Sequence, residues 1–334
     1  MANETGQSNA VPIAPKPKEG EPWDVAIIGS GPAAFTAAIY TTRGAASTII
    51  LGGEKWGGQL MLTTTVDNYP AIPGVQGPDL MARMKDHAVM FGGEFVAEYV
   101  EKVDFAAIPF KLTVNGLEHQ SKTVIVATGA DTKWLGVPGE KELIGKGISS
   151  CAPCDAPFFR GKNVIVVGGG DSAMEEALVL TKYATSVTIV HRRENLRASQ
   201  AMQQKVMTEL KSEKIKVIWN TEVTKFIGTD RLEKVELKNT KDGTTSELPI
   251  DGAFVAIGHV PTTGIFQGQI DLDEKGYVKK QTNDKYQMAT SKSGVFVAGD
   301  VHDYHYRQAV TAAGFGCQAA LETLKFLEKP IPNW

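Results

Sequence analysis

Apolar residues along the chain fall into short runs that end in glycine-rich turns and are followed by longer, helix-length stretches. The clearest example is DVAIIGSGPAAFTAAIYTTRGAASTIIL (residues 24–51), and NVIVVGGGDSAMEEALVLTKYATSVTIV (residues 163–190) aligns with it without gaps. Each copy begins with a β-branched run typical of a buried parallel strand, continues through a helical stretch, and ends in a second β-branched run. The pattern therefore predicts two βαβ units, and such a repeat indicates two separate nucleotide-binding domains.

The turns of both repeats have glycines where binding of a dinucleotide requires them. The segments GSGPAA (residues 29–34) and GGGDSA (residues 168–173) fit the pattern G-x-G-x-x-G/A. The first glycine permits a tight turn, the second lets the backbone approach a pyrophosphate at a helix N-terminus, and the small last residue lets helix and strand pack closely. One such motif is a weak signal, but two at equivalent places in a repeat indicate two dinucleotide sites.

The residues after the second strand differ between the two copies. In the first copy, Glu54 can accept hydrogen bonds from the ribose hydroxyls of FAD or NAD, or it can be a solvated loop acid. In the second copy, His191, Arg192 and Arg193 follow the strand, with Arg197 one helical turn beyond. Guanidinium groups there can bind the 2′-phosphate of NADP bidentately, although an exposed basic helix start is an alternative. In a slightly acidic chain, a basic cluster at this position favours NADPH.

Two further apolar strands point to a flavin. VIVATG (residues 124–129) ends in Thr-Gly, and GVFVAGD (residues 294–300) ends in Gly-Asp. The carboxylate of Asp300 can hold the ribityl or pyrophosphate region of FAD, and a helix predicted over residues 306–314 can direct its N-terminus at the isoalloxazine. The alternative is a surface Asp that caps an ordinary helix. Since the second repeat lies between these flavin motifs, the order predicts a discontinuous FAD domain with an inserted NADPH domain.

The predicted fold is α/β, with two Rossmann-like nucleotide-binding domains of three ββα layers. The FAD-binding domain consists of residues 22–131 and 260–334, and the NADPH-binding domain of residues 132–259 includes a cysteine pair. Residues 1–21 are polar and rich in Pro, Lys and Gly, without the apolar centre of a secretory signal, and we expect a disordered tail there.

Composition limits the partners. The 334 residues include 42% hydrophobic and 22% charged ones, which is ordinary for a globular protein with two cores. A formal net charge of -3 gives no overall attraction to nucleic acid or anionic membrane, and no apolar run approaches the roughly 20 residues of a membrane-spanning helix. We expect neither a nucleic-acid nor a membrane partner. Because the chain does not look like a disulfide-stapled secreted protein, we expect it in the cytoplasm.

Cys151 and Cys154 form a C-x-x-C motif just before the second repeat. We expect no metal, because only Cys317 remains as a further cysteine and the histidines form no H-x₃₋₅-H pair. A redox dithiol is favoured, since two intervening residues allow a small disulfide ring and a helix that starts there would lower a thiol pKa. Asp155 can hold the proton that moves between thiolate and thiol if burial raises its pKa. A helix N-cap is its alternative role.

Together these segments resemble the low-molecular-weight, bacterial and plant-type thioredoxin reductase family. The motifs recur in family order at family-like spacing from about Trp23 to the C-terminus. The matching segments are the first fingerprint at residue 29, GGQL (57–60), NYP (68–70), C-x-x-C-D (151–155), GGGDSAMEEA (168–177), HRR (191–193), AGD (298–300) and YRQA (306–309).

The resemblance implies a homodimer with one FAD per chain and an inserted NADPH domain. It implies that NADPH gives a hydride to FAD, that the flavin passes two electrons to the Cys151–Cys154 disulfide, and that the dithiol reduces thioredoxin. By position, Cys154 resembles the cysteine that faces the flavin and Cys151 the one that attacks the partner disulfide. Asp155 matches the acid/base residue of the family.

The motifs and the resemblance together give the residues expected to contact the cofactors. For FAD these are Gly29, Ser30, Gly31, Pro32, Ala33, Gly52, Glu54, Gly58, Gln59, Asn68, Val100, Thr128, Gly129, Gly299, Asp300, Arg307, Gln308 and Ala309. For NADPH they are Gly168, Gly170, Asp171, Ser172, Ala173, Glu176, His191, Arg192, Arg193 and Arg197.

The cysteine motif departs from the common family pattern. Ala152-Pro153 separates the cysteines, and Ala156-Pro157 follows the acid where Gly is common. Pro153 stiffens the ring and removes a backbone donor, which bears on redox potential and choice of partner and leaves the chemistry unaltered. Alternatives are a reductase of a glutaredoxin-like or peroxiredoxin-linked protein, a thiol oxidase, or a non-catalytic flavin-binding sensor. The basic cluster at 191–193 argues against the oxidase, and retention of both nucleotide motifs and the cysteine pair argues against the sensor.

Overall fold

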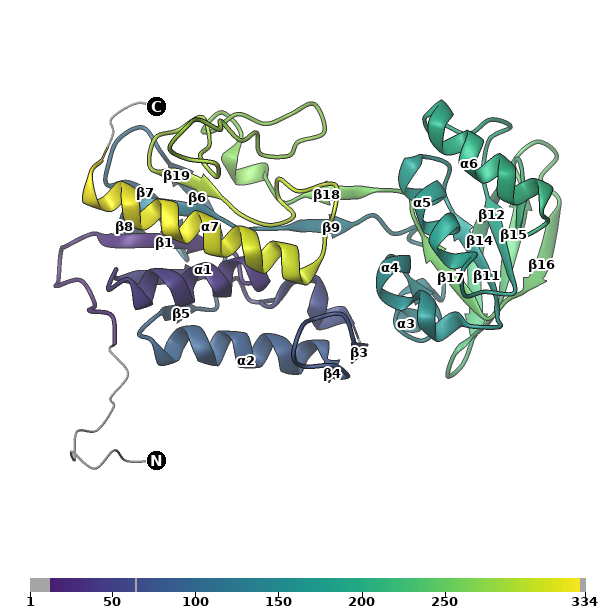
Figure 1. Ribbon diagram of the computed structural model, residues 1–334, viewed down its shortest axis with the longest axis horizontal. Coiled ribbons are helices and arrows are strands. Elements are labelled where there is room, and N and C mark those ends of the chain that lie inside the picture. The colour runs from purple at the N-terminus through teal and green to yellow at the C-terminus, as the bar shows by residue number, and fades with distance from the viewer. Residues whose placement is uncertain (1–12, 64, 331–334) are drawn as a thin grey trace. The chain divides into compact units, whose positions relative to one another are not determined.

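The computed structural model describes residues 13–63 and 65–330, and the chain divides into two compact units (Figure 1). Unit 1 combines Met1–Asp131 with Val260–Trp334, and unit 2 is Thr132–His259. The first glycine-rich fingerprint therefore lies in unit 1 and the second in unit 2.

A mostly parallel sheet forms the centre of unit 1, in the order β5-β2-β1-β8-β7-β6 with β19 beside β8. Strands β1, β2, β5, β8 and β19 pair in parallel, whereas β6, β7 and the first half of β8 form an antiparallel meander. A short antiparallel pair, β3 and β4, lies apart from this sheet. The strands are β1 (Trp23–Ile28), β2 (Thr48–Leu51), β3 (Thr65–Val66), β4 (Val75–Gln76), β5 (Glu94–Val96), β6 (Val100–Asp104), β7 (Phe110–Val114), β8 (Leu117–Val126) and β19 (Val295–Val297).

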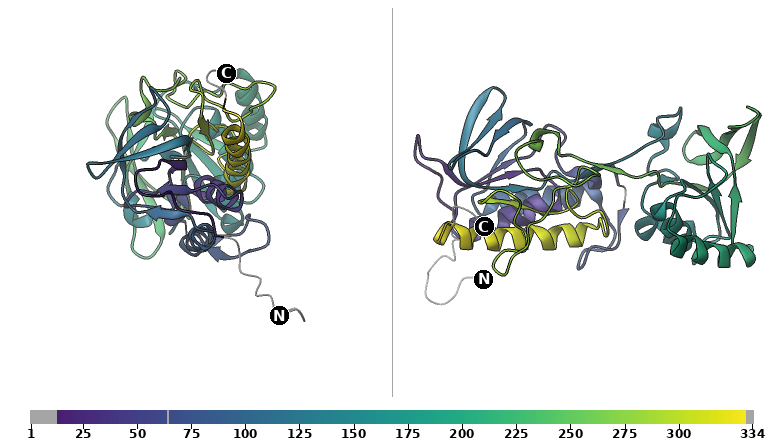
Figure 2. Two further views of the ribbon diagram at one scale, coloured as in Figure 1. Left: turned by 90° about the vertical axis from the view of Figure 1, so that its left-hand side faces the viewer. Right: turned by 90° about the horizontal axis from the view of Figure 1, so that it is seen from above.

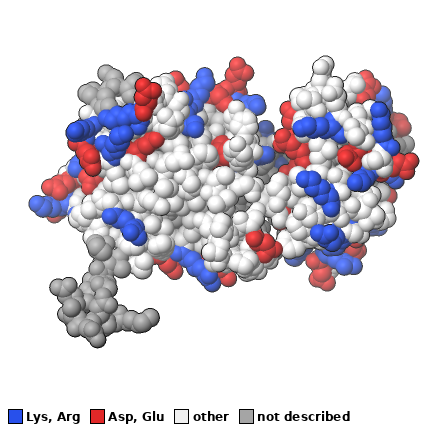
Figure 3. Space-filling view, viewed as in Figure 1, with Lys and Arg blue, Asp and Glu red and all other residues white. Residues whose placement is uncertain are grey.

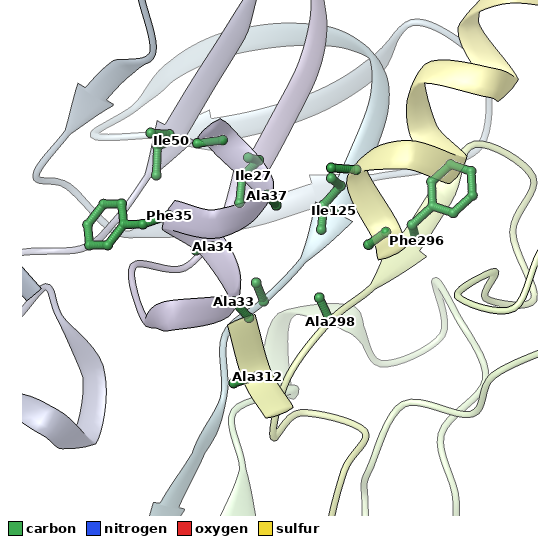
Figure 4. Close-up of a cluster of buried hydrophobic side chains, with 14 of the residues drawn as sticks. Ile27, Ala33, Ala34, Phe35, Ala37, Ile50, Ile125, Phe296, Ala298 and Ala312 are labelled. Atoms are coloured by element: carbon green, nitrogen blue, oxygen red, sulfur yellow. The ribbon is translucent and has the colours of Figure 1, made fainter. Parts of the chain in front are cut away.

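Helices cover one face of this sheet, on the side opposite to the β6–β7 hairpin (Figure 2). They are α1 (Pro32–Arg43), α2 (Gly77–Met90) and α7 (Ala309–Glu328), with the short 3₁₀ helices η1 (Gly58–Leu62) and η3 (Gly264–Phe266) in connecting segments. Ile27, Ile50 and Ile125 pack on the helical side (Figure 4), and Ile28 and Ile49 pack on the other. Burial on both faces explains why these strands read as continuous apolar runs.

Small residues let α1 and α7 pack closely. Ala33, Ala34 and Ala37 of α1 are fully or almost fully buried. A Cβ atom at Gly316 of α7 would lie 2.1 Å from the carbonyl oxygen of Ala33, so a larger residue would force the helices apart. This contact holds the start of α1 and its glycine-rich turn against the C-terminal helix.

Unit 2 has three layers. Its parallel sheet has the order β10-β17-β11-β12-β13, and an antiparallel sheet has the order β14-β15-β16. Met174 and Val206 belong to the core between the parallel sheet and its helices, whereas Phe226 and Val235 belong to the core under the antiparallel sheet. The elements are α3 (Glu140–Leu143), β10 (Ile148–Ser149), α4 (Ala152–Asp155), η2 (Ala156–Phe159), β11 (Asn163–Val167), α5 (Asp171–Leu180), β12 (Ser186–Val190), α6 (Gln200–Lys211), β13 (Ile215–Ile218), β14 (Thr221–Gly228), β15 (Leu232–Asn239), β16 (Thr245–Pro249) and β17 (Gly252–Val255). The predicted α/β fold with two Rossmann-like sheets is confirmed.

The chain crosses between the units twice, through β9 (Ala130–Thr132) and β18 (His259–Pro261), which pair with each other. Among the helices of residues 13–63 and 65–330, none is long and apolar enough to cross a membrane.

The tail expected to be disordered lies partly within the described residues. Its residues 1–12 are outside them, and residues 13–21 form no helix or strand. However, Ala14 is buried and donates its N–H to the carbonyl of Phe91 at 2.9 Å, and Lys16 pairs with Glu94. This part of the tail is therefore attached to unit 1, in contrast to the disorder expected over residues 1–21.

Candidate functional site

The cysteine pair of unit 2 is a disulfide. The Sγ atoms of Cys151 and Cys154 are 2.08 Å apart, and both residues are half-buried. Helix α4, which begins after Cys151, has only four residues. A helix this short supplies only a small dipole for the lowering of a thiol pKa that we expected from a helix start. Pro153 occupies the first turn, where a backbone N–H would have no acceptor within the helix. The proline therefore fits this turn without the loss of a helical hydrogen bond.

Two side chains fix the backbone around the disulfide. The hydroxyl of Ser149 accepts the N–H of Cys151 at 3.0 Å. The buried carboxylate of Glu176, on α5, accepts the N–H of Ala152. Glu176 was predicted as an NADPH contact, and the structure places it against the cysteine turn. The fingerprint helix of unit 2 thus supports the disulfide directly.

Asp155 has the property that an acid/base role requires. Burial raises its pKa above the ordinary value of 3.8, and a hydrogen bond with Ser149 partly opposes the rise. The residue lies at the N-cap of η2, yet its side chain makes no capping hydrogen bond. The structure thus favours the proton-holding role over the alternative of a helix N-cap.

In the glycine-rich turn of unit 2, one glycine packs tightly against the protein and another faces open space that a ligand can occupy. A Cβ atom at Gly168 would lie 2.5 Å from the carbonyl oxygen of Ala256, whereas a Cβ at Gly170 would have nothing within 4 Å. Ala173 is fully buried against this turn, Asp171 accepts the backbone N–H of Ser199 at 2.7 Å, and Ser172 lies between them at the start of α5. These features match the three requirements of a dinucleotide turn.

The basic segment after β12 is tied to the same turn. The N–H groups of Arg197 and Ala198 donate to the carbonyl of Gly169 at 2.7 and 3.1 Å. His191 is buried beneath the turn, with its Nε2 atom 2.9 Å from the carbonyl oxygen of Asn195, and a Cβ at Gly169 would overlap its ring. The structure therefore gives His191 a supporting position, and the arginines an exposed one.

A pocket of about 530 Å³ lies over this basic segment. Four cationic side chains and one carboxylate contribute to its lining. The lining residues are Arg192, Arg193, Glu194, Asn195, Leu196, Arg197, Asn220 and Lys241. A concave surface with this excess of positive charge suits a phosphate group. Asn220 and Lys241 were not anticipated from the sequence, because they come from the connection between β13 and β14 and from the β15–β16 turn.

The glycine-rich turn of unit 1 is built in the same way. A Cβ at Gly29 would lie 2.1 Å from the carbonyl oxygen of Ala127, whereas a Cβ at Gly31 would meet nothing within 4 Å. Ser30 donates to the carbonyl of Gly52 at 2.7 Å and accepts the N–H of Gly57 at 3.1 Å. The fingerprint, the end of β2 and the GGQL segment are thus brought together.

The Gly-Asp segment after β19 lies against the same turn. A Cβ at Gly299 would come within 2.9 Å of the Cβ of Ala33. The Oδ1 atom of Asp300 is buried and has no hydrogen-bond partner among the described residues. Burial raises the pKa of Asp300 to about 7, with Asp303 adding to the rise and Arg307 opposing it. A buried acceptor without a donor is costly, and a hydroxyl of a bound flavin would supply the donor. The site therefore fits FAD.

Other residues predicted to contact FAD come together around these segments. Asn68 donates its side-chain N–H to the amide oxygen of Gln308 at 3.3 Å, although 240 residues separate them in sequence. Gln59 donates its side-chain N–H to Asp131 at 2.9 Å, and Thr128 donates its hydroxyl to the carbonyl of Thr262 at 2.7 Å. The other predicted residues lie at the ends of elements: Pro32 starts α1, Glu54 is exposed after β2, Gly58 starts η1, Val100 is buried at the start of β6, Gly129 follows β8, and Arg307 and Ala309 flank Gln308 at the start of α7.

Comparisons with known proteins agree with this arrangement. Residues 23–316 match the family described as pyridine nucleotide-disulphide oxidoreductase. The chain is 44% identical over 305 residues to the thioredoxin reductase of Coxiella burnetii, covering 90% of this chain and 95% of that protein. It is 48% identical over 310 residues to the thioredoxin reductase of Rickettsia conorii, covering 91% and 98%. The solved structure of thioredoxin reductase from Giardia duodenalis is similar with a TM-score of 0.87 at 40% identity, covering 92% of this chain and 99% of that chain.

Proposed function

The chain belongs to the pyridine nucleotide-disulphide oxidoreductase family, and we propose that it is an NADPH-dependent flavoprotein that reduces the disulfide of thioredoxin. The observation that carries this proposal is the Cys151–Cys154 disulfide, which lies in the same unit as the basic pocket and beside a carboxyl whose pKa is raised. Relatives that are 44% and 48% identical over nine-tenths of the chain are thioredoxin reductases.

The two units divide the cofactors between them. In unit 1, FAD would be held by the turn at Gly29 and Gly31 and by Asp300, whose buried oxygen needs a donor. In unit 2, NADPH would be held by the turn at Gly168 and Gly170 and by the basic pocket. Bound at these two places, the cofactors would supply the hydride chemistry and the two electrons needed to reduce the disulfide.

The residues of unit 2 control where protons and sulfur charges go. Two electrons break the bond between Cys151 and Cys154 and leave a thiolate and, with one proton, a thiol. Asp155 can hold that proton because burial raises its pKa above the ordinary value of an aspartate. The thiolate of Cys151 then attacks one sulfur of the partner disulfide and forms a mixed disulfide, while the S–S bond of the partner breaks and its second sulfur leaves as a thiolate. Cys154 attacks Cys151 in turn, restores the disulfide and releases the partner as a dithiol.

We also place this chain in a homodimer. Exposed apolar side chains lie on the outer helices of unit 1: Tyr40 is 41% exposed, Val310 43% and Leu321 52%. Val310, Gly314 and Leu321 follow helical spacing along one exposed side of α7. Figure 3 shows few charged side chains over this part of unit 1. Such a surface suits an interface between subunits, and sedimentation velocity would give its oligomeric state.

A cytoplasmic location is part of the same proposal. A dithiol that is regenerated by NADPH does its work in a reducing compartment, where protein disulfides are transient and catalytic.

The experiment that tests the proposed function is trapping of the partner. In a Cys154→Ser variant, the Cys151 thiol can attack a thioredoxin disulfide but no second thiol can resolve the product. Mass spectrometry of the mixture should therefore find a covalent complex of the two proteins. Dithiothreitol should separate them, because it reduces the disulfide that joins them. A complex that forms equally well in a Cys151→Ser variant would contradict the assigned order of attack, and no complex in either would contradict thioredoxin as partner.

A further inference from the structure

The turn between β15 and β16 (residues 240–244) contributes Lys241 to the lining of the basic pocket. The backbone N–H of Thr240 donates to the carbonyl of Asn220 at 2.6 Å, and its hydroxyl donates to the carbonyl of Arg192 at 3.2 Å. The N–H of Asn220 donates to the carbonyl of Arg193 at 3.2 Å. The turn is therefore hydrogen-bonded, directly and through Asn220, to the segment that carries the arginines.

The side chain of Lys241 is held at the pocket by a carboxylate. Its Nζ atom is 2.9 Å from an oxygen of Glu194, and its backbone N–H donates to the side chain of Asn239 at 2.8 Å. The side chains of Lys241 and Glu194 are 62% and 66% exposed, and an ion pair so exposed adds little to stability. Lys241 can therefore leave this carboxylate and bind an anion of higher charge with little loss of stability.

The charges of the pocket make this exchange selective. Glu194 is the one carboxylate among the pocket residues, and it competes with an incoming phosphate for the ammonium group of Lys241. A ribose 2′-hydroxyl cannot displace a carboxylate from an ammonium group. A dianionic 2′-phosphate can, because its charge is larger and it has more acceptor atoms.

We propose that Lys241 is a specificity-determining residue for the 2′-phosphate of NADPH, and that Glu194 acts as its competing partner. This inference rests on the proposed function, since it concerns the same nucleotide. Lys241 adds a fourth cation to Arg192, Arg193 and Arg197, and the Glu194 carboxylate keeps Lys241 from attracting nucleotides that lack the 2′-phosphate.

The test measures binding of two probes by isothermal titration calorimetry to the full-length protein with its flavin. Adenosine 2′,5′-bisphosphate carries the 2′-phosphate, and adenosine 5′-monophosphate lacks it; neither has a nicotinamide, so the measurement does not depend on turnover. Lys241→Met removes the charge and keeps the length of the side chain. Lys234→Met is the matched control, because Lys234 lies on the same hairpin in a comparable exposed ion pair with Glu247 but outside the pocket.

We expect Lys241→Met to weaken binding of the bisphosphate by about three- to tenfold and to leave the monophosphate unchanged. Raising the ionic strength should reduce the difference between wild type and variant. Lys234→Met should bind both probes as the wild type does. Glu194→Gln should bind the bisphosphate more tightly than the wild type, and it gives an independent answer should Lys241→Met fold poorly.

Three results would overturn the inference, and a fourth would contradict the proposed function on which it rests. An unchanged affinity of Lys241→Met for the bisphosphate would remove Lys241 from 2′-phosphate recognition, as would an equal loss in Lys234→Met. An unchanged affinity of Glu194→Gln would remove the competing role of the carboxylate. A wild-type protein that binds both probes equally would contradict the NADPH assignment itself, and this outcome is distinguishable because it appears before any substitution.

Discussion

Asp300 allows a prediction in which stability and cofactor binding change in opposite directions. In the protein without flavin, its buried Oδ1 has no partner among the described residues and its pKa is raised to about 7 from 3.8. At 1.36 kcal/mol per pKa unit, this difference corresponds to about 4 kcal/mol. Replacing Asp300 with Asn keeps the shape and removes the ionisable group.

The sign of the effect follows from proton binding. Between pH 4 and 7 the folded state binds more protons at Asp300 than the unfolded state, so the residue lowers the free energy of unfolding as pH rises through this range. Asp300→Asn should therefore stabilise the flavin-free protein by up to about 4 kcal/mol above pH 8 and by less than half of that near pH 5. The same substitution replaces one carboxylate oxygen, a hydrogen-bond acceptor, with an NH₂ group, a donor. It should therefore weaken FAD binding by at least about tenfold.

The assay is urea unfolding of the flavin-free protein at the two pH values, together with a fluorescence titration of FAD. Asp303→Asn is the matched control. The carboxylate of Asp303 accepts backbone N–H groups of His305, Tyr306 and Arg307, so its loss should destabilise the protein at both pH values. If Asp300→Asn gave the same change in unfolding free energy at pH 5 and pH 8.5, the burial of an unpaired carboxylate would not be the cause and the reasoning would be refuted.

Four further predictions concern the electron path, the glycine-rich turn of unit 1 and the basic pocket. Cys154→Ser should abolish thioredoxin reduction while NADPH still bleaches the flavin, and loss of bleaching would contradict the assigned path. Asp155→Asn should slow thioredoxin reduction by about 100-fold or more. The wild-type rate should decline as pH rises through the raised pKa of Asp155, because the residue then loses its proton. If the Asn variant kept this decline, Asp155 would not be its source. Gly29→Ala should cost about 3 kcal/mol or more of stability because of its overlap with Ala127 and its φ of +126°, whereas Gly31→Ala should fold normally and bind FAD weakly, as thermal unfolding and flavin content would show. Arg193→Gln should raise the Kd for NADPH by about tenfold or more and change that for NADH little, and equal changes for both nucleotides would remove the 2′-phosphate assignment.

The parts of this protein that the sequence predicts are those whose chemistry is local. A tight turn at Gly29 or Gly168 needs glycine whatever surrounds it, so the fingerprints and the βαβ units around them are readable directly. The spacing of Cys151 and Cys154 likewise allows a disulfide in a short turn. The order of these motifs gives the α/β fold with one sheet interrupted by the other.

The parts that depend on tertiary contacts could not be predicted. His191 belongs to the basic motif by sequence, but the packing of its ring beneath Gly169 places it under the turn. Lys241 is an ordinary lysine in a hairpin turn, and the hydrogen bonds from Thr240 together with the ion pair to Glu194 bring it to the pocket. Glu176 accepts the N–H of Ala152, and nothing in the sequence around the pair Glu175-Glu176 indicates this contact.

The central claim is that two electrons pass from NADPH through a flavin to the disulfide of Cys151 and Cys154. The most direct test is an anaerobic titration of the purified wild type and of Cys154→Ser with NADPH, in which the flavin absorbance is monitored. We predict that the flavin is reduced in both and that the wild type takes up two electrons more per chain, because its disulfide is reduced as well. A flavin that stays oxidised under excess NADPH, or equal uptake by the two proteins, would contradict the account.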